Sequence, residues 1–343
     1  MRLVLPIAFL SASLSYADLG GKLLPIPVAF TSPETGPGGG AKLRWQDPLD
    51  KPGFADLTGY LTVRSQWNVD AEILRDSLFG LWRLGATAEV GEFPAKWYGL
   101  GNPPPDEMES EYTPRYLGAE FSVGRWLPAG WRVGGRFQAE QWQIQAQDRG
   151  AFHAATWTGQ KGGLEANAGM ELVFEGRDLP TNPTEGLYAK SAVTVGLPIG
   201  DFLWQNLVLD LSMTKSAGSF TGVVRLRHDE AWGGVPFWRV PSLGHKRYLR
   251  GLPDRRLRGE VAECIGSEAR WNGLEVAGFA LQPALFAELG RSGGHADVWQ
   301  EEMNPAAGGG LRVPLAGGKA VLRADYGWSF YGSGLYVDFG QAF

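Results

Sequence analysis

Apolar and polar side chains alternate with a period of two along much of the chain. Between residues 206 and 214 one parity is wholly apolar, while the other is polar except for one valine. Residues 164–175, 187–197, 277–289 and 335–339 repeat this pattern. Because successive side chains of a strand point to opposite faces, the period predicts two-faced β-strands along the whole chain.

The alternating segments are long for strands, at roughly 10 to 14 residues, which fits a tilted bilayer crossing better than a soluble sheet. A soluble antiparallel sheet with one wet face would alternate in the same way. Connection lengths favour an all-β transmembrane antiparallel barrel, because the short turns at 128–130 and 198–201 contrast with long polar loops at 99–111 and 232–256. We expect about 16 strands, near residues 23–30, 40–47, 57–67, 70–82, 84–98, 112–127, 131–146, 163–176, 187–198, 204–215, 220–231, 257–271, 275–290, 306–315, 318–328 and 334–343.

The first residues have the order of a secretory signal. Arg2 precedes an apolar run over residues 3–10, and small side chains lead up to Ala17. We therefore expect residues 1–17 to be a cleaved signal peptide and residues 18–343 to form one outer-membrane barrel domain.

The first and last strands of a barrel meet at a seam. Pro25 and Pro27 lie two residues apart, so within a strand their missing N–H groups would face the same neighbour and weaken that seam. The alternative is that both precede the first strand. Phe339 and Phe343 belong to the last strand, and a terminal Phe343 is an ending typical of outer-membrane barrels.

Composition narrows the class of protein. The chain holds 14 Trp, 17 Phe, 10 Tyr and 49 Gly, a combination that suits aromatic girdles and tight bends. Beyond residue 17 no apolar run approaches the ~20 residues of a spanning helix. The net charge of -5 comes from interspersed acids and bases, which excludes the basic stripe of a nucleic-acid binder. Cys264 is the single cysteine and the four histidines lack ligand spacing, so we expect no disulfide, metal or other cofactor.

Several segments together resemble the BamA and TamA family of outer-membrane assembly and translocation barrels, also called the bacterial surface antigen family. The most specific is VPFWRVPSLGHKRYLRGLP at 235–253, where Leu249, Arg250 and Gly251 fit the family's loop-tip motif. The other segments follow in the family's order along most of the chain: WYGLGN (97–102), RDLPTNPTEGLY (177–188), SEAR (267–270), FAELG (286–290), GGGLRVPL (308–315), RADYG (323–327) and YVDFGQAF (336–343).

The chain also departs from the family's pattern. Leu252 replaces the aromatic residue after the loop-tip motif, and Glu288 replaces an aspartate. We further expect the periplasmic polypeptide-transport-associated domains of well-known members to be absent. The resemblance therefore implies the fold more firmly than it implies protein insertion.

The resemblance implies that the sixth external loop folds into the lumen and that its tip arginine meets acidic groups on the wall. Strand parity agrees, since Glu268 and Glu288 both lie opposite apolar faces. Arg250 carries a planar fork that can hold two carboxylates. An arginine in a polar loop is more often a solvated charge, which is the alternative.

Three functions remain for comparison. The resemblance implies a device for inserting, assembling or translocating proteins or lipids at the cell outer membrane, whose partners are outer-membrane lipids, an unidentified protein or lipid substrate and the machinery that inserts the barrel itself. The alternative is a passive pore or structural barrel plugged by its long loop. A lipid hydrolase would need a Ser, His and acid arrangement, and the serines and histidines show no such pattern, so we expect no catalytic residues and no enzyme.

Overall fold

The computed structural model describes most of the chain. The described residues are 23–32, 36–46, 53–146, 150, 152, 156–276, 278–315 and 320–342. The expected signal peptide and Phe343 lie outside them, so the predictions made for those residues are not addressed by the structure.

Strands make up nearly all of the regular structure. The strands are β1 (Leu23–Ser32), β2 (Gly36–Gln46), β3 (Gly53–Thr62), β4 (Trp67–Leu78), β5 (Trp82–Glu92), β6 (Ala95–Trp97), β7 (Ser110–Trp126), β8 (Trp131–Ala146), β9 (Gly162–Glu175), β10 (Gly186–Gly196), β11 (Trp204–Ala217), β12 (Phe220–Gly233), β13 (Ser242–Leu243), β14 (Leu257–Arg258), β15 (Val261–Trp271), β16 (Leu274–Val276), β17 (Phe279–Gly293), β18 (Asn304–Leu315), β19 (Ala320–Ser329) and β20 (Gly332–Phe339). Three short 3-10 turns are η2 (Asp106–Met108), η3 (Pro128–Gly130) and η4 (Val298–Gln300). No helix in the described part of the chain is long and apolar enough to cross a membrane.

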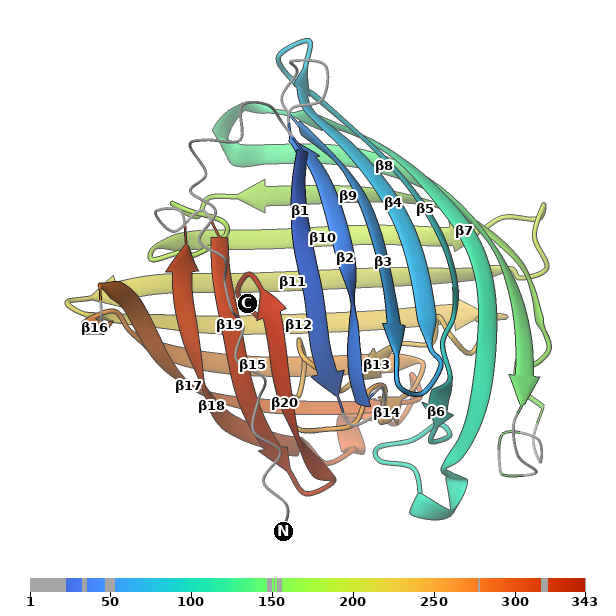
Figure 1. Ribbon diagram of the computed structural model, residues 1–343. Coiled ribbons are helices and arrows are strands. Elements are labelled where there is room, and N and C mark those ends of the chain that lie inside the picture. The colour runs from blue at the N-terminus through green and yellow to red at the C-terminus, as the bar shows by residue number, and fades with distance from the viewer. Residues whose placement is uncertain are drawn as a thin grey trace.

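Eighteen strands form one antiparallel sheet that curves into a barrel (Figure 1). Two of them are short: β6 pairs with β7 beyond the end of β5, and β16 pairs with β17 beside β15. The remaining sixteen pair in chain order, each with the next. The expected all-β barrel of about 16 strands is therefore confirmed.

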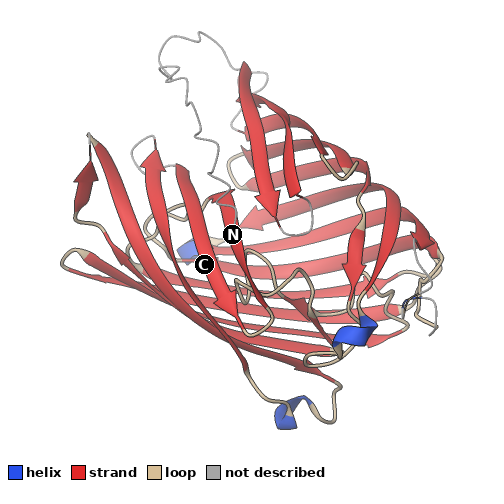
Figure 2. Ribbon diagram, turned by 60° about the horizontal axis from the view of Figure 1, so that its bottom comes forward, coloured by secondary structure: helices blue, strands red, loops and turns tan. Residues whose placement is uncertain are grey.

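The paired strands form the wall of the barrel. This wall has apolar side chains outside and polar side chains inside, which is the reverse of a soluble protein. Apolar side chains point outward, and Met213 and Leu285 are 58% and 72% exposed. Polar side chains of the other parity point into the lumen, where Asn167 and Asp325 are almost completely buried. This arrangement satisfies both a lipid exterior and a polar interior, and Figure 2 shows some loops within the curve of the strands and others beyond the strand ends.

The two ends of the barrel differ. Short turns at 79–81, 127–130 and 218–219 define one end, which we call the turn end. Long connections at 98–109, 234–260 and 294–303 define the other, which we call the loop end. The chain enters β1 and leaves β20 at the turn end, as an even number of antiparallel strands requires.

The last strand is shorter than expected. β20 ends at Phe339, because Gly340 adopts a φ of +90° and turns the chain inward. The Nη1 of Arg225 then donates to the carbonyl of Ala342 over 2.8 Å, and the Gln341 side chain donates to Asn182. The Gly340 N–H still donates to the Val321 carbonyl of β19, and residues 341–342 lie inside the turn end instead of extending the wall.

The seam between the first and last strands lacks a ladder. β1 and β20 lie side by side in Figure 1, yet no backbone hydrogen bonds join them among the described residues. Pro25 and Pro27 both lie inside β1, whose ten residues all pair with β2. Since proline is tolerated where its nitrogen faces away from a ladder, the two missing donors suit the open side of β1.

We predict that the seam strands exchange amide hydrogens faster than central strands. Among the described residues β20 has a ladder with β19 alone, whereas β11 and β12 pair over fourteen residues and are each paired on both sides. Hydrogen exchange read by mass spectrometry should show peptides of β1 and β20 exchanging at least about tenfold faster than peptides of β11. Peptides of β2 serve as the control, and equal protection of β20 and β11 would contradict an open seam.

Candidate functional site

A long connection between β12 and β15 runs inside the lumen. We call residues 234–260 the strap. Its short strands β13 and β14 pair with each other, so the strap doubles back as a hairpin. Leucines of this hairpin pack against the inner wall and are at most 1% exposed: Leu243, Leu249, Leu252 and Leu257. Apolar burial thus holds the strap inside the barrel.

The strap tip fits the wall only because Gly251 has no side chain. Its φ is +110°, and a Cβ there would lie 2.7 Å from backbone atoms of Trp328 in β19. The Gly251 N–H donates to the hydroxyl of Tyr336, and the Ser329 hydroxyl donates to the Gly251 carbonyl, each over 3.1 Å. The preceding Leu249 also has a positive φ, of 55°. The backbone is therefore fixed on both sides of Arg250.

Arg250 grips Glu288 of β17 with both its backbone and its side chain. The backbone N–H donates to Oε2 over 2.6 Å, and Nε donates to Oε1 over 2.9 Å. The guanidinium also lies over the Phe286 ring, with 3.4 Å between Cζ and the ring centroid. Arg250 and Glu288 are both at most 2% exposed to solvent.

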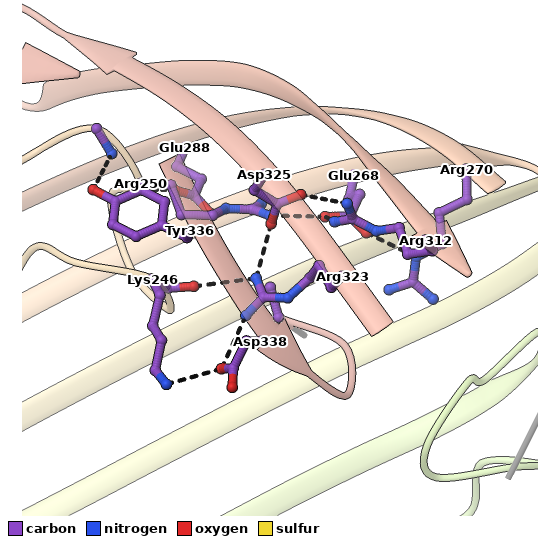
Figure 3. Close-up of polar contacts among 12 residues, drawn as sticks. Lys246, Arg250, Glu268, Arg270, Glu288, Arg312, Arg323, Asp325, Tyr336 and Asp338 are labelled. Atoms are coloured by element: carbon purple, nitrogen blue, oxygen red, sulfur yellow. Dashed lines mark hydrogen bonds and ion pairs between the residues drawn. The ribbon is translucent and has the colours of Figure 1, made fainter. Parts of the chain in front are cut away.

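The same guanidinium reaches two further carboxylates on neighbouring strands (Figure 3). Nη1 of Arg250 lies 3.0 Å from Oε2 of Glu268 and 2.8 Å from Oδ2 of Asp325. One arginine therefore joins β15, β17 and β19 through three acids. Burial opposes its charge, but the carboxylates of Glu288, Glu268 and Asp325 outweigh burial and raise the pKa of Arg250 above its ordinary value.

Three wall arginines complete this charge cluster. Arg270 donates to Glu268 over 2.8 Å, and Arg323 donates to Asp325 over the same distance. Arg312 contacts both acids, 2.8 Å from Glu268. All seven charged residues are at most 2% exposed. We call them the tip cluster: Arg250, Glu268, Arg270, Glu288, Arg312, Arg323 and Asp325.

The structure brings together Arg250, Glu268 and Glu288, which sequence reasoning grouped. Asp325, Arg323 and Arg312 were not assigned to this group from the sequence. Arg312 and Arg323 face each other in the register of β18 and β19. Two arginines opposite each other in a buried position indicate that acids must lie between them, a signal that parity and register together would have given.

A second anchor near the start of the strap was also missed. Arg239 donates through Nε to both oxygens of Glu165 over 2.9 Å and through Nη2 to Glu140 over 2.7 Å. The indole of Trp238 donates to Glu165 over 2.8 Å and stacks on Trp142. The strap is therefore tied to β8 and β9 at its base and to β15, β17 and β19 at its tip.

Aromatic side chains close the loop end above this second anchor. Trp97, Phe152 and Phe237 pack edge to face around Trp97, with ring centroids 5.4 to 5.7 Å apart. The segment 97–102 then meets the strap directly, since the Gly101 N–H donates to the Arg258 carbonyl over 2.8 Å. This packing covers the strap from the loop end.

The turn at 177–185 lies at the opposite end of the barrel. Desolvation raises the pKa of Asp178, but hydrogen bonds from Thr184, Glu185 and Leu179 together outweigh it and lower the pKa to about 2. The Pro183 carbonyl accepts a hydrogen bond of 3.4 Å from Arg270, which links this turn to the tip cluster. Of the expected seam residues, Pro25 and Pro27 lie in β1 and Phe339 is the last residue of β20, while Phe343 lies outside the described part.

No protein-family model matches the chain, and no curated protein matches it in sequence. Solved structures do match. BamA from Haemophilus ducreyi lacking POTRA domains 1-3 has a TM-score of 0.66 at 12% identity over 92% of this chain and 69% of that one. CdiB from Escherichia coli has a TM-score of 0.66 at 11% identity over 92% and 61%. CdiB from Acinetobacter baumannii has a TM-score of 0.59 at 13% identity over 93% and 59%. This chain thus spans less than two thirds of either CdiB chain, and the likeness at these identities is one of fold: a sixteen-stranded barrel similar to those of BamA and CdiB.

Proposed function

We propose that this chain is an outer-membrane barrel of the family that includes BamA and CdiB, and that it inserts, assembles or translocates proteins or lipids at the outer membrane. The observation that carries the proposal is the seam. In a hydrocarbon layer an unpaired strand edge leaves backbone groups unsatisfied, so such an edge favours pairing with another strand or entry of a polar chain. A client strand adding to this edge would gain hydrogen bonds that the free barrel lacks.

The tip cluster supports the same proposal. It binds the strap to β15, β17 and β19, so the wall on one side of the seam is braced from inside. Its partners would be the surrounding outer-membrane lipids, a protein or lipid client, and the machinery that inserts the barrel itself.

The competing function is a passive or structural barrel that the strap plugs. Two anchors and an aromatic cover at the loop end favour a permanent plug. The two functions differ in whether the seam opens, and the experiments below separate them.

We predict that the mature chain fractionates with outer membranes and migrates faster on gels when unheated than after boiling. A nearly continuous ladder of sixteen strands keeps the folded barrel compact in detergent. Membrane fractionation and paired heated and unheated lanes measure both properties. Recovery of the chain as a soluble periplasmic protein would refute the outer-membrane location.

We predict that Arg250→Ala releases the strap while the barrel stays folded. Removing one member of a buried ion pair costs about 3 to 5 kcal/mol, because the remaining charges stay buried. Within the described residues, the hydrogen bonds to Glu288 come from Arg250 alone, so this acid is left without a donor. Protease cleavage within 234–260 and single-channel conductance should both rise.

Two further variants make this test specific. Adding Glu288→Gln to Arg250→Ala removes the buried carboxylate charge that has lost its partner. This double variant should restore part of the resistance of residues 234–260 to protease. Arg115→Ala removes an arginine that contacts Glu92 away from the strap, and its cleavage pattern should stay that of the parent. Parental cleavage and conductance in Arg250→Ala would show that the tip cluster does not hold the strap.

We predict that a disulfide between β1 and β20 abolishes the ability of this chain to accelerate the folding of another outer-membrane protein. In a Cys264→Ser background, Val337→Cys in β20 is combined with single cysteines scanned along residues 23–26 of β1. Vesicles containing the reduced protein should accelerate the folding of a urea-denatured eight-stranded outer-membrane barrel, and the disulfide should remove that acceleration until reductant is added. A disulfide between Leu211→Cys and Leu226→Cys, which face each other in β11 and β12, is the matched control. Acceleration that survives the seam lock would exclude the seam as the route, and no acceleration in any form would favour the plugged barrel.

A further inference from the structure

A second compartment lies at the turn end of the lumen. It is a cavity of about 860 Å³, lined by strands from β4 to β12, by the turn at 177–181 and by the tail at 340–342. Arg247 and Tyr248 of the strap also line it. We call this cavity the chamber. Its volume is within the range of small-ligand sites, and it contains none of the tip cluster residues.

Positive charge dominates the chamber lining. Eight arginine or lysine side chains line it, against four carboxylates. Arg83 and Arg177 pair with acids that are not part of the lining, whereas Arg227 pairs with Asp229 outside the lining and, over 3.6 Å, with Asp210 inside it. An anion in the chamber therefore meets more cationic than anionic side chains in the lining.

Arg136 is positioned by a hydrogen bond, and other N–H groups of its guanidinium can donate to a ligand. Its Nη2 donates to the Thr194 hydroxyl over 3.0 Å, while its nearest acid, Glu120, lies 3.5 Å from Nη1. The side chain is 42% exposed to the chamber. It lies against Gly169, where a Cβ would come within 3.0 Å of Nε, so the glycine leaves the space that the arginine occupies.

Arg247 faces the chamber from the strap. In the described part of the chain it takes part in no ion pair, and it lines the cavity beside Tyr248. The Tyr248 hydroxyl accepts hydrogen bonds from Arg225 over 2.7 Å and from Arg227 over 3.1 Å. The strap therefore places one uncompensated cation above a wall that already holds an excess of them.

We propose that the chamber binds a phosphate group, with Arg136 of the wall and Arg247 of the strap among its direct donors. Arginine forks match the oxygens of a phosphate, and a dianion offsets more of the surrounding charge than a carboxylate does. The phosphate can belong to a free phosphate compound or to a lipid headgroup, and the same donors serve both. This site is independent of the seam and of client folding.

The test is calorimetric titration of the folded full-length chain in a non-ionic detergent. One arm uses inorganic pyrophosphate, a second uses dihexanoyl phosphatidic acid, and a third uses dihexanoyl phosphatidylcholine as the zwitterionic comparison. We expect saturable binding of at least one of the first two, weakened at least about tenfold by Arg136→Gln with Arg247→Gln, since two charge-assisted contacts are lost. Binding by pyrophosphate alone assigns the site to free phosphates, and binding by the phosphatidic acid alone assigns it to headgroups.

The matched control is Arg115→Gln with Arg125→Gln, which removes the same charge from side chains that do not line the chamber. Unheated gel mobility verifies that each variant is folded, and Arg247→Gln alone repeats the test if the double variant fails to fold. The proposal is overturned if neither phosphate compound binds, or if the chamber variant and the control variant weaken binding equally. It is also overturned if phosphatidylcholine binds as tightly as phosphatidic acid.

Discussion

The contact between Arg250 and three carboxylates is the interaction on which the inner architecture depends. Four arginines and three acids of the tip cluster are all shielded from water, so each charge is tolerated only because the others are present. Arg250 is the single member supplied by the strap; the other six come from β15, β17, β18 and β19. Without the strap tip, Glu288 would be a buried acid without a donor. The wall and the strap are therefore complementary parts of one polar core.

This polar core explains why the lumen can be filled without an ordinary apolar interior. Leucines of the strap hairpin supply local apolar packing, and ion pairs hold the rest of the strap to the wall. The outer surface carries the apolar residues instead, because lipid covers it in the proposed setting. The same alternation along each strand therefore serves both a lipid-facing exterior and a charged interior.

Sequence reasoning predicted the barrel because its signal is local. Parity assigns each strand residue to a face, and this was enough to place Glu268 and Glu288 inward. It does not give the relative height of residues on different strands, which is why Asp325 was not assigned to Arg250. The partner acids of Arg239 lie 74 and 99 residues away along the chain, and no local pattern links residues so far apart. The inward turn at Gly340 was missed because Phe343 was expected to end the last strand, although Gln341 interrupts the apolar parity of Leu335, Val337 and Phe339.

The two strap anchors contact some strands of the wall and leave others without an internal contact of this kind. Arg239 is bound to β8 and β9, and Arg250 is bound to β15, β17 and β19, with Tyr336 of β20 beside the tip. These anchors brace the wall from its middle to the last strand, and none of them lies on β1 to β4. Those first strands are held by their own ladders and end at the unladdered seam, where β1 carries two prolines. A separation of β1 from β20 would therefore not require any of the anchor contacts to break, because these contacts lie on β8, β9, β15, β17 and β19.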